Sequence, residues 1–128
     1  MNKEQVDIFL VIYSKGGKVK KGDCKYIMTC RGKSIEKRET YADTTGHRLA
    51  LQCFVASLKR MRKASILTVH TDCYYLINGY QRLLQYKSAG WTRDGNKELK
   101  NADLWEELDG LLSEHAVRFK AEYMKLYE

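Results

Sequence analysis

The segment from Lys15 to Asp23, KGGKVKKGD, concentrates side chains suited to binding an anion. Its four lysines lie among three glycines, and we call it the lysine segment; they are Lys15, Lys18, Lys20 and Lys21. Ammonium groups on such a loop can contact phosphate without reading a base sequence. The same composition also suits a solvated loop with no ligand, so the pattern alone leaves both interpretations open.

Two junctions between elements offer further chemistry. Asp72 follows the strand-like SILTVHT of residues 65–71 and precedes a helical pattern. A carboxylate there can cap the helix or act as an oxygen ligand for a hard cation. Thr45, Gly46 and His47 begin another helical pattern, whose first backbone N–H groups can bind phosphate or be capped within the chain. His70, inside its strand, is expected to be a hydrogen-bonded core histidine.

The cysteines give no sign of a metal cluster or a disulfide framework. None of Cys24, Cys30, Cys53 and Cys73 forms a C-x-x-C pair, and no histidine stands at zinc-finger spacing from them. We expect buried thiols in a reducing cytoplasm. The opening MNKEQVD lacks an apolar signal core, which also favours a cytoplasmic location.

Charge and length point to one basic domain. The 128 residues carry a net charge of +7 and no proline, and residues 1–71 hold fifteen of the 23 basic residues but only six of the 16 acids. We expect a single domain over residues 1–128. No apolar run approaches the roughly 18 residues of a membrane span, so no membrane partner is expected. A basic surface favours a polyanionic partner such as nucleic acid, although a merely soluble basic surface is an alternative.

Hydrophobic periodicity predicts eight elements. Alternating and apolar runs predict strands, and 3.6-residue spacing predicts helices. The strands are 6–13, 24–30, 34–42, 65–71 and 116–123; the helices are 47–62, 73–86 and 101–114, the last capped by Asn101; residues 87–100 are a polar loop. The order β-β-β-α-β-α-α-β predicts an α/β fold, a mixed five-stranded sheet flanked by helices.

Three ordered motifs within this pattern resemble ribonuclease H of type 1. They are Gly90-Trp91-Thr92 through Lys100-Asn101-Ala102-Asp103-Leu104-Trp105-Glu106-Glu107-Leu108, Asp43-Thr44-Thr45-Gly46-His47-Arg48-Leu49, and Leu67-Thr68-Val69-His70-Thr71-Asp72. The resemblance covers nearly the whole chain. It implies a ribonuclease H-like sheet that lacks the final helix, because Glu128 comes before that helix would begin.

The resemblance also implies a site for two divalent metals held by four carboxylates, which activate a water for phosphodiester hydrolysis. The four positions fall at Val11, at Ala50, at Asp72 and beyond Glu128. Valine and alanine cannot ligate a metal, so Asp72 is predicted to be a vestigial catalytic residue and at most a weak metal ligand. Asp7 stands roughly 13 Å along the strand from Val11, too far to substitute. No cofactor is expected, and Mg²⁺ or Mn²⁺ would matter only if cleavage persists.

Several other positions correspond to parts of the family that face the nucleic acid. In the family, the glycine-rich loop after the first strand follows the RNA, and a basic protrusion, here residues 87–100, grips the duplex. The implied nucleic-acid-binding residues are Lys15, Lys18, Lys20, Lys21, Thr45, Gly46, His47, Tyr86, Trp91, Arg93, Lys97 and Lys100. Trp91 can equally be a core residue, and Trp105 is expected to be one.

Three functions are therefore weighed. The first is a nucleic-acid-binding domain, for an RNA–DNA hybrid or another duplex, that has lost hydrolysis. The second is an active metal-dependent hybrid ribonuclease with rearranged ligands. The third is a protein–protein interaction module on the same fold, which nine tyrosines would suit. The sequence does not identify the nucleic acid, a protein partner or the oligomeric state.

Overall fold

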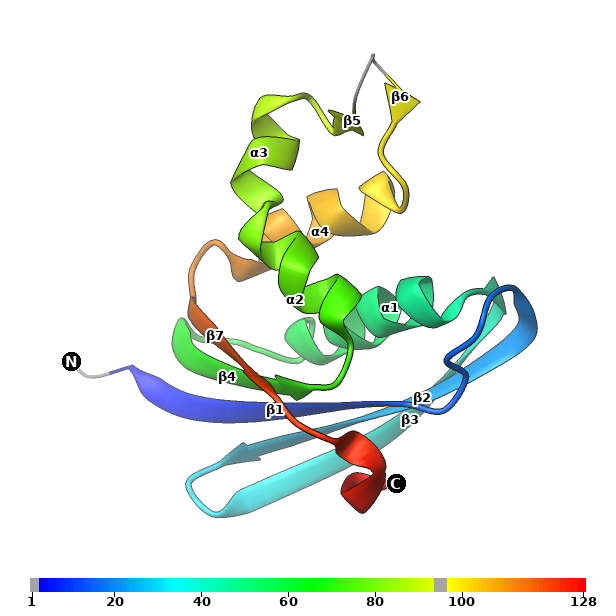
Figure 1. Cartoon of the computed structure of the whole chain (residues 1–128). Coiled ribbons are helices and arrows are strands. Elements are labelled where there is room, and N and C mark those ends of the chain that lie inside the picture. Colours follow the sequence, from blue (N-terminus) through cyan, green and yellow to red (C-terminus); the bar gives the residue numbers. More distant parts are fainter. Residues whose placement is uncertain (1–2, 94–96) are drawn as a thin grey trace.

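The computed structural model describes residues 3–93 and 97–128, arranged as a five-stranded sheet with helices packed on it (Figure 1). The strands are β1 (Glu4–Ile12), β2 (Val19–Cys30), β3 (Lys33–Thr44), β4 (Ser65–Thr71), β5 (Thr92–Arg93), β6 (Lys97–Glu98) and β7 (Ala116–Ala121). The helices are α1 (Gly46–Leu58), α2 (Tyr74–Gln81), α3 (Leu83–Ser88), α4 (Ala102–Leu112) and a final 3₁₀ turn, η2 (Met124–Tyr127). Among the described residues, no helix is long and apolar enough to cross a bilayer.

The sheet has the predicted mixed topology. Its strand order is β3-β2-β1-β4-β7. β1 pairs antiparallel with β2 and parallel with β4, and β7 extends the parallel side. The strand that the sequence reads as buried and central, β1, lies in the middle, which confirms that prediction.

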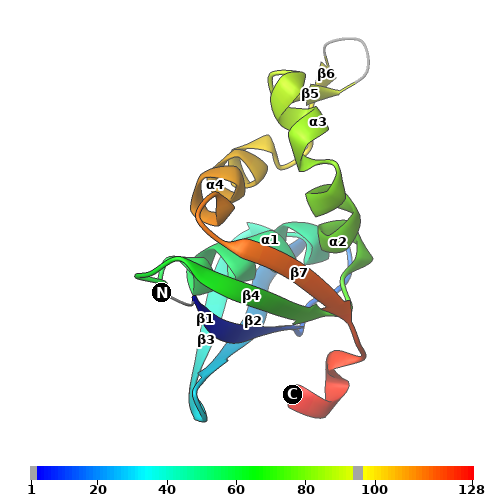
Figure 2. The same cartoon turned by 90° about the vertical axis from the view of Figure 1, so that its left-hand side faces the viewer.

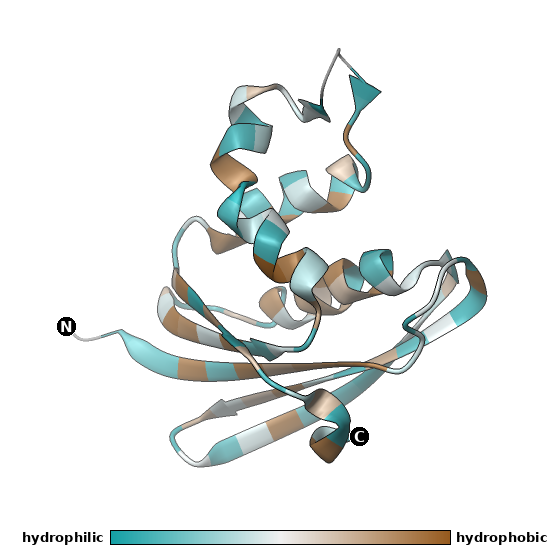
Figure 3. Ribbon diagram, in the orientation of Figure 1, coloured by the Kyte–Doolittle hydropathy of each residue, from teal (hydrophilic) through white to brown (hydrophobic). Residues whose placement is uncertain are grey.

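The main core lies between one face of the sheet and the helices. Ile8, Leu10 and Ile12 alternate along β1 and are almost fully buried. They pack with the buried side of α1, including Leu49 and Phe54. Figures 2 and 3 show α1, α2 and α4 on this side of the sheet and the apolar stretches of the helices turned toward it. The apolar residues that alternate along β1 and those that recur at helical spacing in α1 therefore form the two sides of one core.

The opposite face of the sheet carries η2 and a polar network around His70. The imidazole Nε2 lies 2.7 Å from Asp7 Oδ1, and Nδ1 lies 2.7 Å from Glu122 Oε2. The ring stacks on Phe9, with centroids 4.1 Å apart, and Phe9 also contacts Tyr127 of η2. The Tyr127 hydroxyl donates to Glu122 Oε1 at 2.7 Å. His70 is thus a satisfied core histidine, as predicted, and its network fastens η2 to the sheet.

This network should make the free energy of unfolding depend on pH. Hydrogen bonds from His70 and Tyr127 hold the pKa of Glu122 below its usual value. A depressed pKa in the folded chain stabilises it above the ordinary carboxyl pKa, and this contribution is lost as pH falls through the folded pKa. We expect Glu122→Gln to flatten the fall in the free energy of unfolding below about pH 4, measured by urea denaturation. Glu114→Gln, at an exposed carboxylate outside the network, should keep the full wild-type pH dependence; identical profiles for the two variants would contradict the assignment.

Four local predictions are wrong. The predicted helix 73–86 is two helices, because the Arg82 N–H bonds to Gly79 O, three residues back, and tightens the chain into a new turn. The polar loop 87–100 contains the paired strands β5 and β6. The lysine segment is only partly a loop, since Lys20 and Lys21 belong to β2. Asn101 makes no side-chain cap for α4, because its amide contacts other residues and its backbone is left-handed, at φ 61°.

Candidate functional site

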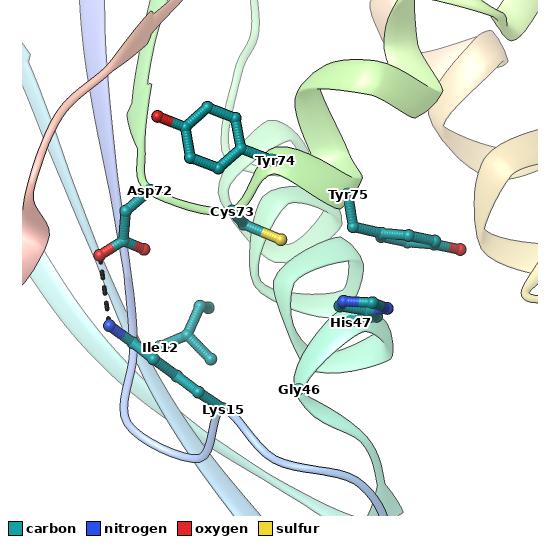
Figure 4. A pocket seen from close by; sticks show the side chains of 8 residues that line it. All are labelled: Ile12, Lys15, Gly46, His47, Asp72, Cys73, Tyr74 and Tyr75. Carbon is teal, nitrogen blue, oxygen red and sulfur yellow. Dashed lines mark hydrogen bonds and ion pairs between the residues drawn. The ribbon is translucent and has the colours of Figure 1, made fainter.

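A pocket of about 230 Å³ lies where the carboxyl ends of β1 and β4 meet the first turns of α1 and α2 (Figure 4). Parallel strands place the residues that follow them at one edge of the sheet, which is a common location for ligand sites. The pocket is lined by Ile12, Lys15, Gly46, His47, Asp72, Cys73, Tyr74 and Tyr75. Four residues predicted from the sequence, Lys15, Gly46, His47 and Asp72, are thus brought together.

Asp72 forms an ion pair inside this pocket. Lys15 Nζ lies 3.2 Å from Asp72 Oδ2, and the backbone N–H of Met124 donates to the same oxygen at 3.3 Å. The predicted helix cap is wrong, because α2 has no side-chain cap and Cys73 N donates instead to Thr71 Oγ1. The one carboxylate of the pocket is therefore neutralised by the first lysine of the lysine segment. The neighbouring Cys73 thiol is a poor nucleophile, because burial raises its pKa.

The other positions implied for metal-binding acids are buried and apolar. Continuing the β1–β4 register beyond its Phe9–His70 pair places Val11 level with Asp72. Val11 is 1% exposed, and Ala50 on α1 is fully buried. Asp7 is held by His70 further along β1, so it does not approach. In residues 3–93 and 97–128 no group of three or more His, Cys, Asp or Glu side chains could hold a metal ion, and the residues present do not fit a two-metal centre.

A second lysine, not singled out from the sequence, occupies the same region. Lys25 pairs with Val11 across β1 and β2 and is 4% exposed. Its ammonium donates to the backbone oxygens of Tyr127 and Glu128 and lies 3.5 Å from Glu36 Oε1. The only signal in the sequence was a lysine inside an otherwise apolar alternation, which does not reveal the carbonyl groups that accept its hydrogen bonds. Lys15 and Lys25 thus both lie at this end of the sheet, each paired with a carboxylate, that of Asp72 and that of Glu36 respectively.

The N-terminus of α1 is capped from within the chain. Thr45 Oγ1 accepts the Arg48 N–H at 3.1 Å, and Gly46 N donates to Gly16 O at 2.9 Å. A Cβ at position 46 would stand 2.6 Å from Lys15 O, so only glycine allows this approach. Gly46 therefore helps to position the lysine segment, and the N–H groups of Gly46 and Arg48 are used within the chain rather than offered to a phosphate.

A chain of contacts connects the pocket to the protrusion. His47 stacks on Tyr75, with centroids 4.3 Å apart and planes within 5°. The Tyr75 hydroxyl accepts from Asn101 Nδ2 at 3.0 Å and from Trp105 Nε1 at 3.2 Å. The protrusion therefore has a fixed base beside the pocket. The sequence motif that includes Asn101 and Trp105 points to this contact, but the role of Tyr75 is visible only in the structure.

Arg48 strengthens the same junction. Its guanidinium donates to both carboxylate oxygens of Asp103, at 3.0 and 2.8 Å, and to Asn101 Oδ1 at 3.2 Å. This fork lowers the pKa of Asp103 and raises that of Arg48. The first turns of α1 and α4 are thereby held together, which explains why Asn101 does not cap its own helix.

In the protrusion and at its base, the aromatic residues face inward and the cations face solvent. Tyr86 packs on Trp105 with centroids 6.0 Å apart, and Trp91 is half-buried against the core. Arg93, Lys97 and Lys100 are exposed. Arg93 and Lys97 are direct partners across β5 and β6, an arrangement that is unfavourable for like charges. Trp105 is 2% exposed, as predicted for a core residue.

The lysine segment presents its charges on both sides of the sheet. Lys15, Lys18, Lys20 and Lys21 are all exposed. Gly22 faces Leu49 of α1, so Lys20, two residues earlier, lies on the helix side of β2 and Lys21 on the other. In Figure 1 the protrusion, the starts of α4 and α1, and the β1–β2 loop follow one another down the right-hand side of the molecule.

The chain is similar in sequence to known proteins. Residues 9–123 match the RNase H family model. A ribonuclease H from Francisella philomiragia is 37% identical over 92 residues, which are 71% of this chain and 60% of that protein. The chain thus spans less than two thirds of the length of this relative.

Solved structures show the same fold at low identity. LC9-RNase H1, a type 1 RNase H with the type 2 active-site motif, superposes with a TM-score of 0.76 at 18% identity, covering 94% of this chain and 63% of that one. The foamy viral protease–reverse transcriptase in complex with an RNA/DNA hybrid gives a TM-score of 0.66 at 10% identity, covering 98% of this chain and 18% of that one. These likenesses agree with the observed sheet order and helices.

Proposed function

Since the chain belongs to the ribonuclease H family, we propose that it is a nucleic-acid-binding domain that holds an RNA–DNA hybrid or another duplex without cutting it. The observation that carries this proposal is the ion pair between Lys15 and Asp72. It joins a cation to the carboxylate that would bind a metal if this chain followed the ribonuclease H pattern. The pair forms without a bound metal, and the attraction for phosphate comes from the exposed cations around the pocket.

The loss of cleavage follows from the donor set. Hard divalent cations require several oxygen ligands in one place, and here Val11 and Ala50 supply none while Asp72 already accepts from Lys15 and Met124. One engaged carboxylate holds Mg²⁺ or Mn²⁺ poorly. Without the metals, the family's means of activating a water and stabilising the leaving oxygen is lost, so hydrolysis by that route is not expected.

Binding follows from the exposed cations on either side of the pocket. Lys18 and Lys20 lie beyond it on the lysine segment, and Arg93, Lys97 and Lys100 lie on the protrusion. The Arg48 and Tyr75 contacts fix the distance between the two groups. The unfavourable Arg93–Lys97 pairing would be relieved by an anion placed over it. A relative with the same fold was solved with an RNA/DNA hybrid, which supports the choice of ligand.

The binding proposal is tested with a labelled RNA–DNA hybrid. We expect fluorescence anisotropy to show saturable binding at about 50 mM salt, equally in Mg²⁺ and in EDTA, with an affinity that falls steeply as salt rises. Duplex DNA and duplex RNA serve as parallel ligands. The proposal fails if none of the three binds at low salt, and a requirement for the metal would contradict the role given to the lysines.

A further inference from the structure

A second groove lies at the end of the sheet opposite the pocket. It has a volume of about 490 Å³ and is bounded by the start of β1, the β2–β3 hairpin and residues 60–65, which follow α1. In Figure 1 these segments gather on the left, beside the N-terminus, whereas the lysine segment lies on the right. Nothing in the proposed function uses this surface.

The floor of the groove is apolar. It includes Val6 of β1, Met28 of β2 and Met61, with Ile35 of β3 beside them. Met28 and Ile35 are cross-strand partners, and Ile35 is 40% exposed. Because α1 ends at Leu58, it does not cover this part of the sheet. The floor therefore offers an apolar strip to a ligand.

The rim of the groove is strongly basic. Its cations are Arg31 and Lys33 from the hairpin and Arg60, Arg62 and Lys63 from the segment after α1, and all are exposed. The one acid among the lining residues is Glu4, which pairs with Arg31 at 2.9 Å and accepts the Cys30 thiol at 3.2 Å. At least four cations thus surround an apolar floor without a carboxylate of the groove to pair with.

We propose that this groove binds an acidic peptide segment of a partner protein, one that carries apolar side chains between its carboxylates. The apolar side chains would cover the strip formed by Met28, Ile35 and Met61, and the carboxylates would pair with the rim. A nucleic-acid duplex fits this surface less well, because its phosphates would contact the rim but leave the apolar floor uncovered. The combination of floor and rim therefore favours the peptide.

This proposal is independent of nucleic-acid binding, because the two surfaces lie at opposite ends of the sheet. A peptide in the groove and a duplex over the pocket do not compete for the same residues. The domain would then recruit a protein partner while it holds a nucleic acid.

The test uses a labelled peptide in which Asp and Leu alternate, because an extended chain places alternate side chains on opposite sides. We expect saturable binding by anisotropy at about 50 mM salt, weakened by added salt. Arg60→Glu/Arg62→Glu should lower the affinity at least about tenfold. Lys87→Glu/Lys125→Glu, which makes the same charge change at exposed lysines outside the groove, should leave peptide binding unchanged.

A second variant tests the floor. Ile35→Ser should weaken binding of the Asp–Leu peptide several-fold and leave unchanged the weaker binding of a peptide in which Asp and Ser alternate. Failure of the Asp–Leu peptide to bind, or equal binding of the two peptides, would overturn the proposal. It would also be overturned if Arg60→Glu/Arg62→Glu weakened hybrid binding as much as peptide binding, since the groove would then belong to the nucleic-acid surface.

Discussion

Replacing Lys18 and Lys20 with Glu is expected to lower the affinity for an RNA–DNA hybrid by about 100-fold at low salt and to reduce the dependence of affinity on salt by about two phosphate contacts. Both side chains are exposed, and Lys20 lies on the helix side of β2. Neither forms an ion pair in the structure's described residues, unlike Lys15, so the substitution leaves the Lys15–Asp72 contact in place. Anisotropy titrations at several salt concentrations measure both effects.

Lys21→Glu is the matched control for this variant. Lys21 is also exposed and is adjacent in sequence, but its side chain lies on the opposite side of the sheet. We expect a loss several-fold smaller than for Lys20→Glu alone. Equal losses for the two single variants would mean that the effect is one of overall charge and not of a defined contact surface.

Trp105→Ala is expected to lower the free energy of unfolding by about 3–5 kcal/mol. The indole is 2% exposed, covers Gly79 of α2 so closely that a Cβ there would stand 2.2 Å from the ring, and donates to Tyr75 OH. Its removal leaves a large cavity between α2 and α4 and takes away the surface on which Tyr86 rests. Urea denaturation gives the change directly.

Trp91→Ala provides the comparison for Trp105→Ala. Trp91 is only half-buried and packs at the edge of the core. Its truncation therefore leaves a smaller cavity than that of Trp105. We expect a loss clearly smaller than that for Trp105→Ala. A larger effect at position 91 would show that the protrusion, and not the α2–α4 contact, dominates stability.

The fold could be predicted from the sequence because its signals are local. The apolar alternation of β1 and the 3.6-residue spacing of α1 are each complete within a short window, and β4 was predicted with the bounds that the structure gives it, Ser65–Thr71. The break between α2 and α3 was missed because the apolar spacing in the sequence continues across the turn at Arg82, although Leu84 is 76% exposed in the structure. β5 and β6 were missed because each strand has only two residues, which are too few to show an alternation in the sequence.

The site was predicted only in part. The lysine segment led to Lys15, and two of the three motifs led to Gly46, His47 and Asp72; all four residues line one pocket. The sequence could not show that Asp72 pairs with Lys15 in place of capping α2, because that contact joins residues 57 positions apart. Lys25 and Tyr75 were missed for the same reason: each acts through a partner from a distant element, Tyr127 and Asn101 respectively.

The central claim, a ribonuclease H-family domain that holds nucleic acid without cutting it, is tested most directly by incubating the protein with an end-labelled RNA–DNA hybrid in Mg²⁺ or Mn²⁺, at a concentration where anisotropy shows the hybrid to be bound. Denaturing gels report cleavage of the RNA strand. We expect the bound RNA to remain intact, in the wild type and in Asp72→Asn alike. Cleavage by the wild type that disappears in Asp72→Asn would contradict the account, because it would show that Asp72 still supports metal-dependent hydrolysis.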